Sequence, residues 1–570
     1  MAKLQIKYMP TRKKIIPLVM AIANGIIKKL RFVENINELT DWDRAHWNIS
    51  PGSLAKMLVM CTFTDIRIPL THLEDRLENI DVEFFLDPMD KSTFVNESNV
   101  GEALDRIGEA DYNGICERVA LSAVQQYNIP ITRMHSDTST ISFSGEYDID
   151  NLDLTEEEKE DLLHIERGWN KDGRPQDKQA VVGQIVNEFG IPIINRIMDG
   201  ATSDVEWNRE AINYAQKIVE TGFTDGIFVA DSKVVVEDLV RKMNDPENRL
   251  QFVSLCPANF DDSLERRMIS KAYESGQWET IGAITGNKNA TQYKGMSFTE
   301  DVYGSQMRLV VFESDSKKQK AIKYVTKKES MLAPMVKTLE SRQWMCQADA
   351  EAERDKFLSM KELALFECEV SIEKRVKEKW PPGRRGANTK PTIKETYHLN
   401  VEKITRSESA CQDFLQRESC FVLISNVSDG TSDVDLLKIY KGQQTVENSF
   451  RALKSPQLAS VIYLKNPKRI QALSMILSFA LLIRALIQFR LREGLKLHNE
   501  EYPDTPIYAG WGGRPLKAPT FKLLYEHSIN CCFEQERSGE YSFSWLSNIM
   551  RQRVEPLLKL MDLTLDQLLE

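Results

Sequence analysis

Residues Ile131–Tyr147 read ITRMHSDTSTISFSGEY, and here the helical periodicity of the preceding chain gives way to the Thr, Ile and Phe content of a β-strand. Two apolar runs follow, Ala180–Val186 and Ile191–Met198, and the turn NEFG that joins them predicts a hairpin. A helix over Val205–Glu220 and a buried strand over Gly226–Ala230 come next. This order predicts an α/β fold, a mixed sheet with helices on both faces.

The sheet pattern continues with another helix and the strand Gln251–Leu255, and then breaks off until Cys420–Asn426. Within the interruption, the runs MRLVVFES and AIKYVTKK predict a second hairpin, and a long charged helix is expected around Ser341–Cys368. After Cys420–Asn426 come a helix over Tyr440–Lys454 and an apolar helix over Ala472–Phe489, which is expected to pack behind it. A large insertion therefore interrupts the predicted sheet.

The regions that flank the sheet are predicted to be helical. Ser50-Pro51-Gly52 is typical of a helix start, Asn99–Ala110 and Tyr112–Tyr127 predict two more helices, and no strand is expected before residue 131. At 570 residues the chain is too long for one core. The expected parts are a helical N-terminal region (1–130), a first sheet segment (131–258), an insertion of hairpins and helices (259–415), a second sheet segment (416–495) and a helical C-terminal region (496–570).

Composition excludes several classes of protein. Hydrophobic residues make up 42% of the chain and charged residues 28%, as in soluble globular proteins. No secretory leader opens the chain, and the nine cysteines contain no CxxC pair, so neither a zinc cage nor a disulfide framework is expected and a reducing cytoplasm fits. The apolar run Ala472–Ile483 is too short to span a bilayer and predicts a buried helix, so no membrane association is expected.

Charge is distributed unevenly along the chain. The net charge of −10 argues weakly against a nucleic-acid partner. However, residues Met1–Phe32 carry Lys and Arg but no acids, Ser371–Lys394 is also basic, and the acidic stretch Glu146–Asp161 offsets much of this positive charge. A locally basic surface on an acidic protein can still bind phosphate.

The segment Tyr440–Lys454, YKGQQTVENSFRALK, concentrates chemistry on one side of its predicted helix. Helical spacing places one set of side chains along a single stripe: Tyr440, Gln443, Glu447, Arg451 and Lys454. The opposite side can face a core through Val446, Phe450 and Leu453. A carboxylate framed by phosphate-binding side chains suits a site where a metal ion handles a nucleic-acid backbone. The alternative is an ordinary amphipathic helix with a solvated charged face.

Three carboxylates can complete such a site. Asp137 lies in the first strand, Asp231 at the carboxyl end of the fourth, and Glu447 on the helix after the last. If the first and fourth strands are neighbours, these acids converge and repel each other unless cations neutralise them. Mg²⁺ or Mn²⁺ is the natural neutraliser, and two such ions can clamp a phosphodiester. Taken singly, each acid has another interpretation: a strand-end acid for Asp137, a helix N-cap for Asp231 and a surface ion pair for Glu447.

Together these segments resemble the DDE transposases of bacterial insertion sequences. The chain is most similar to the cut-and-paste group with a Tyr-x2-Arg-x3-Glu-x6-Lys signature, which stands here as Tyr440, Gln443, Glu447 and Lys454. HSDTSTISFSGEY resembles the strand of the first Asp in this family, and GIFVADS that of the second. The chain departs from the family at Gln443, since Gln adds no charge where the family has Arg. Arg451, one turn beyond Glu447, can supply that charge.

The resemblance implies a ribonuclease H-like core, with a β-rich insertion, in which Asp137, Asp231 and Glu447 bind two Mg²⁺ ions, with Mn²⁺ as a substitute. The implied reaction is hydrolytic cleavage at transposon ends followed by attack of the freed 3′-hydroxyl on target DNA. The implied partners are double-stranded DNA (terminal inverted repeats and target) and a second copy of the chain, in the cytoplasm. Lys454 and Tyr440 would hold phosphates near the scissile bond.

Further DNA contacts are expected outside this site. The basic N-terminal segment, with Lys13 and Lys14, is expected to read the terminal repeats, and the insertion offers a second basic surface; the alternative for both is a solvated tail or loop. The basic residues of the insertion are Lys374, Arg375, Lys377, Arg384 and Arg385. If a DNA hairpin forms, a flipped base needs an aromatic partner. Trp344 is the candidate, with a core or interface tryptophan as the alternative.

Other chemistries fit less well. His135 shares a strand face with Asp137, but no His-rich motif follows, so His135 is interpreted as structural or as a neighbour of the metal ligands. Ser142 and Ser144 lack a partnered histidine, which argues against a serine hydrolase. Two rival functions remain open: a metal-dependent nuclease that cuts without joining, and a non-catalytic DNA-binding protein derived from a transposase. The presence of all three acids argues against the second rival.

Overall fold

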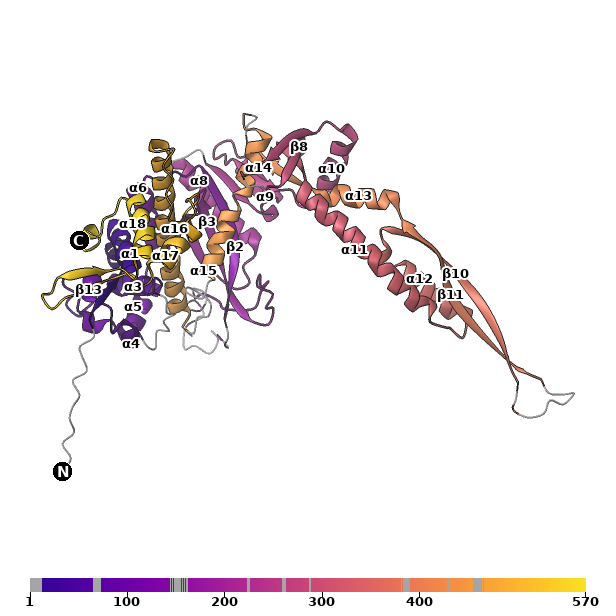
Figure 1. Ribbon diagram of the computed structural model, residues 1–570, viewed down its shortest axis with the longest axis horizontal. Coiled ribbons are helices and arrows are strands. Elements are labelled where there is room, and N and C mark those ends of the chain that lie inside the picture. Colours follow the sequence, from indigo (N-terminus) through magenta and orange to yellow (C-terminus); the bar gives the residue numbers. More distant parts are fainter. Residues whose placement is uncertain are drawn as a thin grey trace, which may run out of the picture. The chain divides into compact units, whose positions relative to one another are not determined.

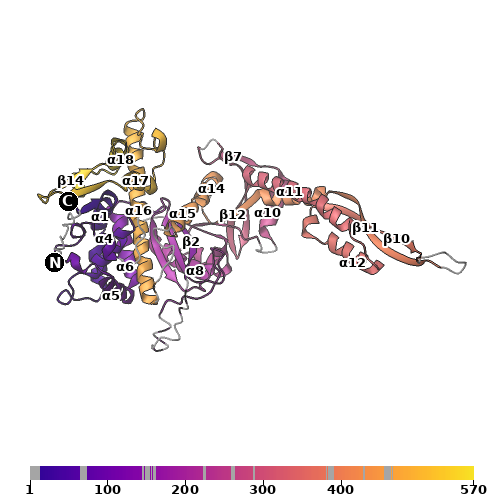
Figure 2. The same ribbon diagram turned by 60° about the horizontal axis from the view of Figure 1, so that its bottom comes forward.

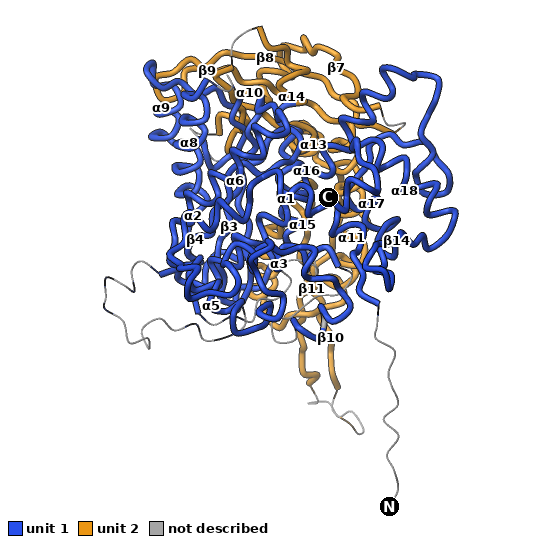
Figure 3. Tube along the Cα trace, turned by 90° about the vertical axis from the view of Figure 1, so that its left-hand side faces the viewer, with its two compact units in different colours: residues 1–252, 439–570 blue, residues 253–438 orange. Residues whose placement is uncertain are grey.

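The structure is a computed structural model that falls into two compact units (Figure 3). Unit 1 comprises Met1–Phe252 and Ile439–Glu570, and unit 2 comprises Val253–Lys438. The structure describes residues 13–570 except 65–72, 144, 146, 148–154, 156, 158, 160–161, 223–225, 259–262, 287–288, 381, 383–389, 428–429, 455–463 and 465.

The sheet of unit 1 places strands in the order β4-β3-β2-β5, and the boundary strand β6 comes next. The strands are β2 (Arg133–Phe143), β3 (Lys178–Asn187), β4 (Pro192–Met198), β5 (Ile227–Ala230) and β6 (Phe252–Leu255). β2, β3 and β4 pair antiparallel, whereas β5 runs parallel to β2. The first and fourth strands are therefore neighbours, which is the condition on which the expected convergence of Asp137 and Asp231 depends.

Helices cover both faces of this sheet, as the alternation of side chains along β2 shows. On one face, the indole Nε1 of Trp207 in α8 (Asp204–Glu220) donates to the Ser136 hydroxyl at 3.0 Å. On the other face lies α15 (Gln444–Leu453), because Gly442 just before it lies against the ring of His135, the residue next to Ser136 on β2. The side chains expected to face a core from α15 are buried: Val446, Phe450 and Leu453. The predicted α/β fold with helices on both faces is confirmed for unit 1.

The remaining helices of unit 1 gather around a single long helix, α16 (Pro467–Glu501), which packs against α3, α5, α18 and β4 and lies beside the N-terminal helices in Figures 1 and 2. The N-terminal helices are α1 (Leu18–Lys29), α2 (Phe32–Leu39), α3 (Pro51–Cys61), α4 (Leu73–Leu77), α5 (Glu97–Glu109) and α6 (Tyr112–Gln126). The others are α9 (Glu237–Met243), α17 (Phe521–Ser528) and α18 (Asn548–Leu560). The predicted helix start at Ser50 is confirmed, since its hydroxyl accepts from Ser53 N at 3.1 Å.

Within the described part of the chain, α16 is the one helix long and apolar enough to cross a membrane. Its most apolar window is 78% buried inside the protein. That burial is typical of a core helix, because a spanning helix would turn much of this surface toward lipid. The interpretation of Ala472–Ile483 as a buried segment therefore agrees with the structure, although the helix around it is longer than expected.

The expectation that the terminal regions are purely helical is wrong. β1 (Ile15–Pro17) pairs with β13 (Cys532–Gln535), which pairs with β14 (Tyr541–Ser544), forming a small antiparallel sheet. A three-residue strand such as β1 carries no periodicity of its own. It exists because residues more than 500 positions away in the sequence supply its partner strand.

Within unit 2 the strand order is β6-β12-β9-β8-β7, and each neighbouring pair is antiparallel. The strands are β7 (Glu279–Ala283), β8 (Gln292–Val302), β9 (Ser305–Ser314) and β12 (Cys420–Ser425), and a separate hairpin is formed by β10 (Phe366–Lys379) and β11 (Thr392–Arg406). Its helices are α10 (Leu264–Ser275), α11 (Asp315–Glu340), α12 (Gln347–Leu358) and α13 (Glu408–Ser419), and α14 (Asp433–Lys441) ends across the boundary.

Two predictions within unit 2 are wrong. MRLVVFES lies in β9 and pairs with β8, whereas AIKYVTKK lies inside α11. In α11 the buried side chains Ala321 and Val325 are four residues apart, so they share one face of the helix. Burial of that face stabilises a helix here, although the β-branched residues of the segment favour a strand. The charged helix expected around Ser341–Cys368 is shorter than that range: α12 spans only Gln347–Leu358, and from Phe366 the chain forms β10.

Candidate active site

The parallel pairing of β2 with β5 places Asp137 and Asp231 side by side. In the parallel pair of β2 and β5, His135 lies opposite Val229. Asp137 and Asp231 each come two residues after this pair, Asp137 within β2 and Asp231 just past the end of β5. Asp231 also caps the short 3-10 helix that follows, accepting from Lys233 N at 3.1 Å. The N-cap interpretation and the proximity to Asp137 are therefore both correct.

These two acids share an electrostatic environment that disfavours their charge. Burial raises the pKa of Asp137 to about 6, and the neighbouring charges of Asp231 and Asp204 add to the rise, against the opposing effect of Lys171. Burial also raises the pKa of Asp231, again with a contribution from Asp204. Partly desolvated carboxylates that repel each other form a site with affinity for cations.

The structure adds Asp204 to this group, a residue that the sequence reasoning missed. Asp204 opens α8, and its carboxylate accepts hydrogen bonds from the Thr138 hydroxyl and from Lys171 Nζ, the latter at 2.9 Å. Burial alone would raise the pKa of Asp204, but these two donors hold it below its usual value. In the sequence, Asp204 stands between the capping residue Ser203 and Glu206, where an acid is ordinarily explained by the helix dipole.

Glu447 approaches the site from α15. It lies in the first turn of that helix with its side chain exposed. The phenol of Tyr440 is close enough to Glu447 and to Asp231 to be affected by both charges. Burial raises the pKa of Tyr440, and the charges of Asp231 and Glu447 raise it further. Tyr440 therefore lies in the field of two of the three predicted acids.

The donor atoms fit a hard divalent cation, but they do not form a complete metal cage. The oxygens of Asp137, Asp204 and Asp231 are of the type that Mg²⁺ prefers. A positive charge, the ammonium of Lys171, already lies among them, 2.9 Å from Asp204 and 3.8 Å from Asp137. In the described ranges, no three or more His, Cys, Asp or Glu side chains are close enough together to hold one ion. An ion shared with Glu447 would require side chains to move.

The predicted continuous helix over Tyr440–Lys454 is interrupted. α14 ends at Lys441 and α15 begins at Gln444, with a turn at Gly442 and Gln443 between them. A Cβ on residue 442 would lie 2.6 Å from the His135 ring. The close approach of this turn to β2 therefore requires glycine. Because the turn interrupts the helix, Tyr440 does not share one continuous helical face with Glu447 and Lys454.

This turn gives Gln443 and His135 structural roles. The Gln443 amide nitrogen donates to the Ser136 carbonyl at 2.7 Å, which fastens the turn to β2. His135 is 1% exposed, and burial lowers its pKa to about 4, so the ring is neutral at neutral pH. The structural interpretation of His135 agrees with this placement, while phosphate binding by Gln443 stays a prediction.

The two cations of the signature region have different surroundings. Lys454 Nζ forms an ion pair with Asp172 at 2.6 Å, and Asp172 directly follows Lys171 in the loop between β2 and β3. Arg451 is exposed, and its guanidinium donates to the Asn448 side chain at 2.9 Å. The loop thus contacts Asp137 through one residue and Lys454 through the next.

The same loop presents a tryptophan that the sequence reasoning overlooked. Trp169 is 88% exposed. Its neighbours fix the loop: a Cβ on Gly168 would lie 2.2 Å from the Gly200 carbonyl oxygen, and the Asn170 amide donates to Ser142 at 3.0 Å. Lys171 N also donates to Thr140 at 3.2 Å. The backbone is thus held on both sides of an indole that faces solvent, two residues from a contact of Asp137.

The other predicted DNA-binding residues belong to other elements of the chain or fall outside the described residues. Lys13 pairs with Glu534 of β13 at 3.0 Å, and the Lys14 carbonyl accepts from Gln535 N at 3.0 Å. Trp344 belongs to unit 2, where it is partly buried against a small apolar cluster and exchanges backbone hydrogen bonds with Tyr397. Arg384 and Arg385 fall outside the described residues.

Comparisons with known proteins give a partial match. The family model described as "Domain of unknown function (DUF4277)" matches residues 14–121, and this family is found in transposases. A solved structure that resembles the chain is a cryo-EM structure of a piggyBac transposase synaptic complex with hairpin DNA. It shares 9% sequence identity, covers 96% of this chain and 87% of that chain, and has a TM-score of 0.38. No curated protein matches. The matched residues cover the N-terminal helices α1 to α5 and part of α6.

Proposed function

We propose that this protein is a transposase that cuts DNA at transposon ends and joins the freed ends to a target. The observation that carries the proposal is the placement of Asp137 and Asp231 on neighbouring strands, buried and mutually repelling, beside a lysine. The match of residues 14–121 to a family found in transposases supports the same conclusion independently of the site.

The proposed core is ribonuclease H-like. Three antiparallel strands, a covering helix and a parallel fourth strand with helices on both faces support this assignment. Asp137 lies within β2, Asp231 directly follows β5 and Glu447 lies on α15, an order that supports a DDE arrangement. In the sequence, unit 2 (Val253–Lys438) lies between Asp231 and Glu447, so the last acid follows the insertion.

In the proposed reaction, Asp137, Asp231 and Glu447 would hold Mg²⁺ or Mn²⁺ together with the scissile phosphate. The metal ions would supply charge neutralisation and an activated oxygen nucleophile. Lys171 would compensate the charge of Asp137 and Asp204 before DNA arrives, as its contacts to both acids suggest. Lys454 would exchange Asp172 for a phosphate oxygen, and Tyr440 would hydrogen-bond a neighbouring phosphate. Two copies of the chain would pair the two transposon ends.

The test is a strand-transfer assay with Mg²⁺, labelled DNA carrying the inverted repeats that flank the gene, and a target plasmid. The wild type should give joined products. Asp231→Asn and Glu447→Gln should each abolish cleavage while retaining DNA binding. The matched control is Asp238→Asn. Asp238 lies on α9 and forms an exposed ion pair with Arg209 of α8, so this substitution also removes one carboxylate. Full cleavage by Asp231→Asn would reject its catalytic assignment.

The same assay separates the rival functions. Cleavage without joined products would assign a metal-dependent nuclease on the same core. DNA binding without cleavage, at any concentration of Mg²⁺ or Mn²⁺, would assign a non-catalytic binding protein. The second outcome is not expected, since a binding protein gains nothing from two neighbouring carboxylates, Asp137 and Asp231, whose pKa values are raised by burial.

A further inference from the structure

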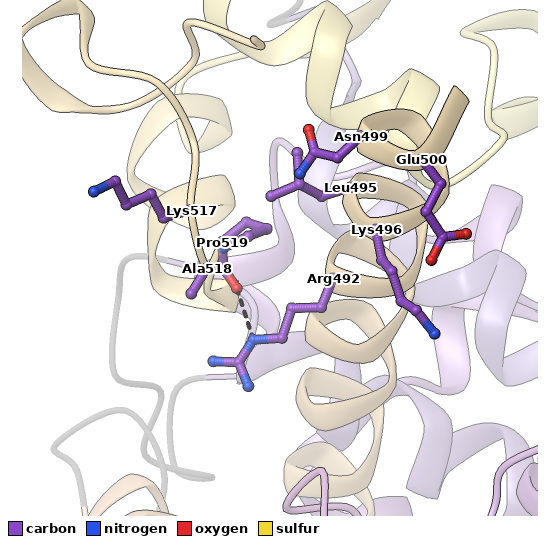
Figure 4. A pocket seen from close by; sticks show the side chains of 8 residues that line it. All are labelled: Arg492, Leu495, Lys496, Asn499, Glu500, Lys517, Ala518 and Pro519. Atoms are coloured by element: carbon purple, nitrogen blue, oxygen red, sulfur yellow. Dashed lines mark hydrogen bonds between the residues drawn. The ribbon is translucent and has the colours of Figure 1, made fainter. Parts of the chain in front are cut away.

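A basic cavity lies at the far end of α16, away in sequence from the residues of the proposed active site (Figure 4). Its volume is about 550 Å³. One wall is a stretch of α16 and the other is the segment that leads into α17, as the close view shows. The lining residues are Arg492, Leu495, Lys496, Asn499, Glu500, Lys517, Ala518 and Pro519. Three cations therefore border the cavity against a single carboxylate.

Arg492 is held in place without an acidic partner. Its Nε donates to the Pro519 carbonyl at 3.2 Å, which joins α16 to the segment that leads into α17 (Figure 4). The two terminal nitrogens of the guanidinium take no part in this bond. Burial lowers the pKa of Arg492, although the group stays charged at neutral pH. Among the residues that the structure describes, no carboxylate forms an ion pair with Arg492, Lys496 or Lys517.

A partly buried guanidinium that lacks an anion favours a ligand that supplies one. The planar fork of an arginine matches two oxygens of a phosphate, and the lysines at the rim add positive charge without fixed geometry. The apolar side chains of Leu495, Ala518 and Pro519 suit the sugar carbons that flank a phosphodiester. Asn499 can donate or accept hydrogen bonds at the same rim.

We propose that this cavity binds a backbone phosphate of double-stranded DNA, with Arg492 as the central contact and Lys496 and Lys517 beside it. This inference rests on the proposed function and extends it by assigning the C-terminal part of unit 1 to DNA binding. The cavity would hold DNA outside the cleavage site, so its residues contribute to affinity and not to the chemical step.

The experiment measures the affinity of the full-length protein for a fluorescent duplex by anisotropy at several salt concentrations. Arg492→Ala and Lys517→Ala should each weaken binding by about tenfold or less, with Arg492→Ala the larger effect. Each should also reduce the slope of log affinity against log salt concentration by about 0.9, the value expected for the loss of one phosphate contact. The matched control is Lys522→Ala, because Lys522 carries the same charge on α17, pairs with Glu526 at 3.6 Å and does not line the cavity.

Equal weakening in Lys522→Ala would overturn the proposal, since the effect would then come from overall charge. Unchanged affinity in both cavity variants would overturn it too. If Arg492→Ala does not fold, as judged by thermal unfolding, the exposed Lys517→Ala and Lys496→Ala carry the test.

A second arm uses inorganic phosphate as the probe to separate the sources of the anion. Phosphate binding that depends on Arg492, with DNA affinity unaffected by the same substitution, would assign a small-anion site and overturn the DNA assignment. The two proposals fail differently: wild-type protein that cleaves and joins DNA while Arg492→Ala binds it normally refutes only this inference. Wild-type protein that binds no DNA refutes both.

Discussion

Lys171 reaches Asp137 from the loop between β2 and β3, with Nζ and Oδ1 3.8 Å apart. The two side chains are 28% and 26% exposed. A cation at this distance favours the charged carboxylate, yet burial and two neighbouring acids still raise the pKa of Asp137 to about 6. Lys171 therefore offsets only part of the free-energy cost of charging Asp137. Binding of a metal ion or of a proton would relieve the rest of that cost.

Replacing Asp137 with asparagine is expected to stabilise the metal-free protein at pH 8. The folded-state pKa of about 6 lies above the ordinary value of 3.8, so the folded state binds the proton more tightly than the unfolded chain. The resulting penalty is absent below pH 4, grows between pH 4 and 6, and is complete above. Two pKa units correspond to about 3 kcal/mol, and because the carboxylate is 26% exposed, solvent screening reduces the expected gain to about 1–2 kcal/mol. Urea unfolding in a chelator at pH 4 and pH 8 measures this difference.

The gain should shrink when Mg²⁺ is added, because an ion bound to the wild type compensates the same carboxylate. Asp238→Asn, on the exposed surface of α9, is the control with the opposite sign: Arg209 lowers the pKa of Asp238, so this substitution should slightly destabilise the protein at pH 8 and less so at pH 4. A stabilisation of the same size at pH 4 and pH 8 would show that packing, not the charge of Asp137, is responsible.

Asp172→Asn is expected to strengthen DNA binding by releasing Lys454. Their ion pair is 2.6 Å long, with the side chains 37% and 25% exposed, so solvent screening limits it to about 1 kcal/mol, or roughly fivefold in affinity. Lys454→Ala should weaken binding, and the double variant should behave like Lys454→Ala alone. Anisotropy with labelled duplex DNA measures all three. If Asp172→Asn strengthens binding equally with and without Lys454, general charge reduction explains the gain.

Trp169→Ala is expected to impair DNA processing more than it impairs folding. The indole is 88% exposed on a loop that is fixed on both sides, so its removal costs little packing but takes away a stacking surface for a nucleobase. Stacking contributes about 1–3 kcal/mol per base, which corresponds to roughly fivefold or more in affinity or rate. Trp169→Phe should retain most of the activity. Equal activity of the Ala and Phe variants in the strand-transfer assay would remove Trp169 from the site.

The strands that frame the site were predictable because their signals are local. β2, β3, β4 and β5 each carry a run of apolar or β-branched residues bounded by turn residues, and the structure places them within a few residues of the predicted bounds. The pairing of β2 with β5 was only a condition of the sequence argument, because strand content does not determine strand order, and the structure supplies that pairing.

The features that could not be predicted depend on contacts between distant segments. Asp204 has the sequence context of an ordinary helix start, and only the fold places it beside Thr138 and Lys171. Trp169 stands in a polar loop whose fixed course depends on Gly200 and Ser142. The break at Gly442 is invisible to helical periodicity, because the partner that requires it, His135, lies on β2.

Gly442→Ala tests whether this break positions Glu447. The added Cβ would lie 2.6 Å from the His135 ring and 3.0 Å from the Ile439 carbonyl oxygen, so the turn must shift away from β2. Overpacking of this kind costs about 1–3 kcal/mol in the free energy of unfolding. It should also strain the hydrogen bond from Gln443 to Ser136 and displace α15, which reduces cleavage more than DNA binding. Gly430→Ala is the matched control, since a Cβ there meets nothing within 4 Å. Urea unfolding and the strand-transfer assay give the two readouts, and a variant that loses stability but cleaves normally would show that Glu447 does not depend on the turn.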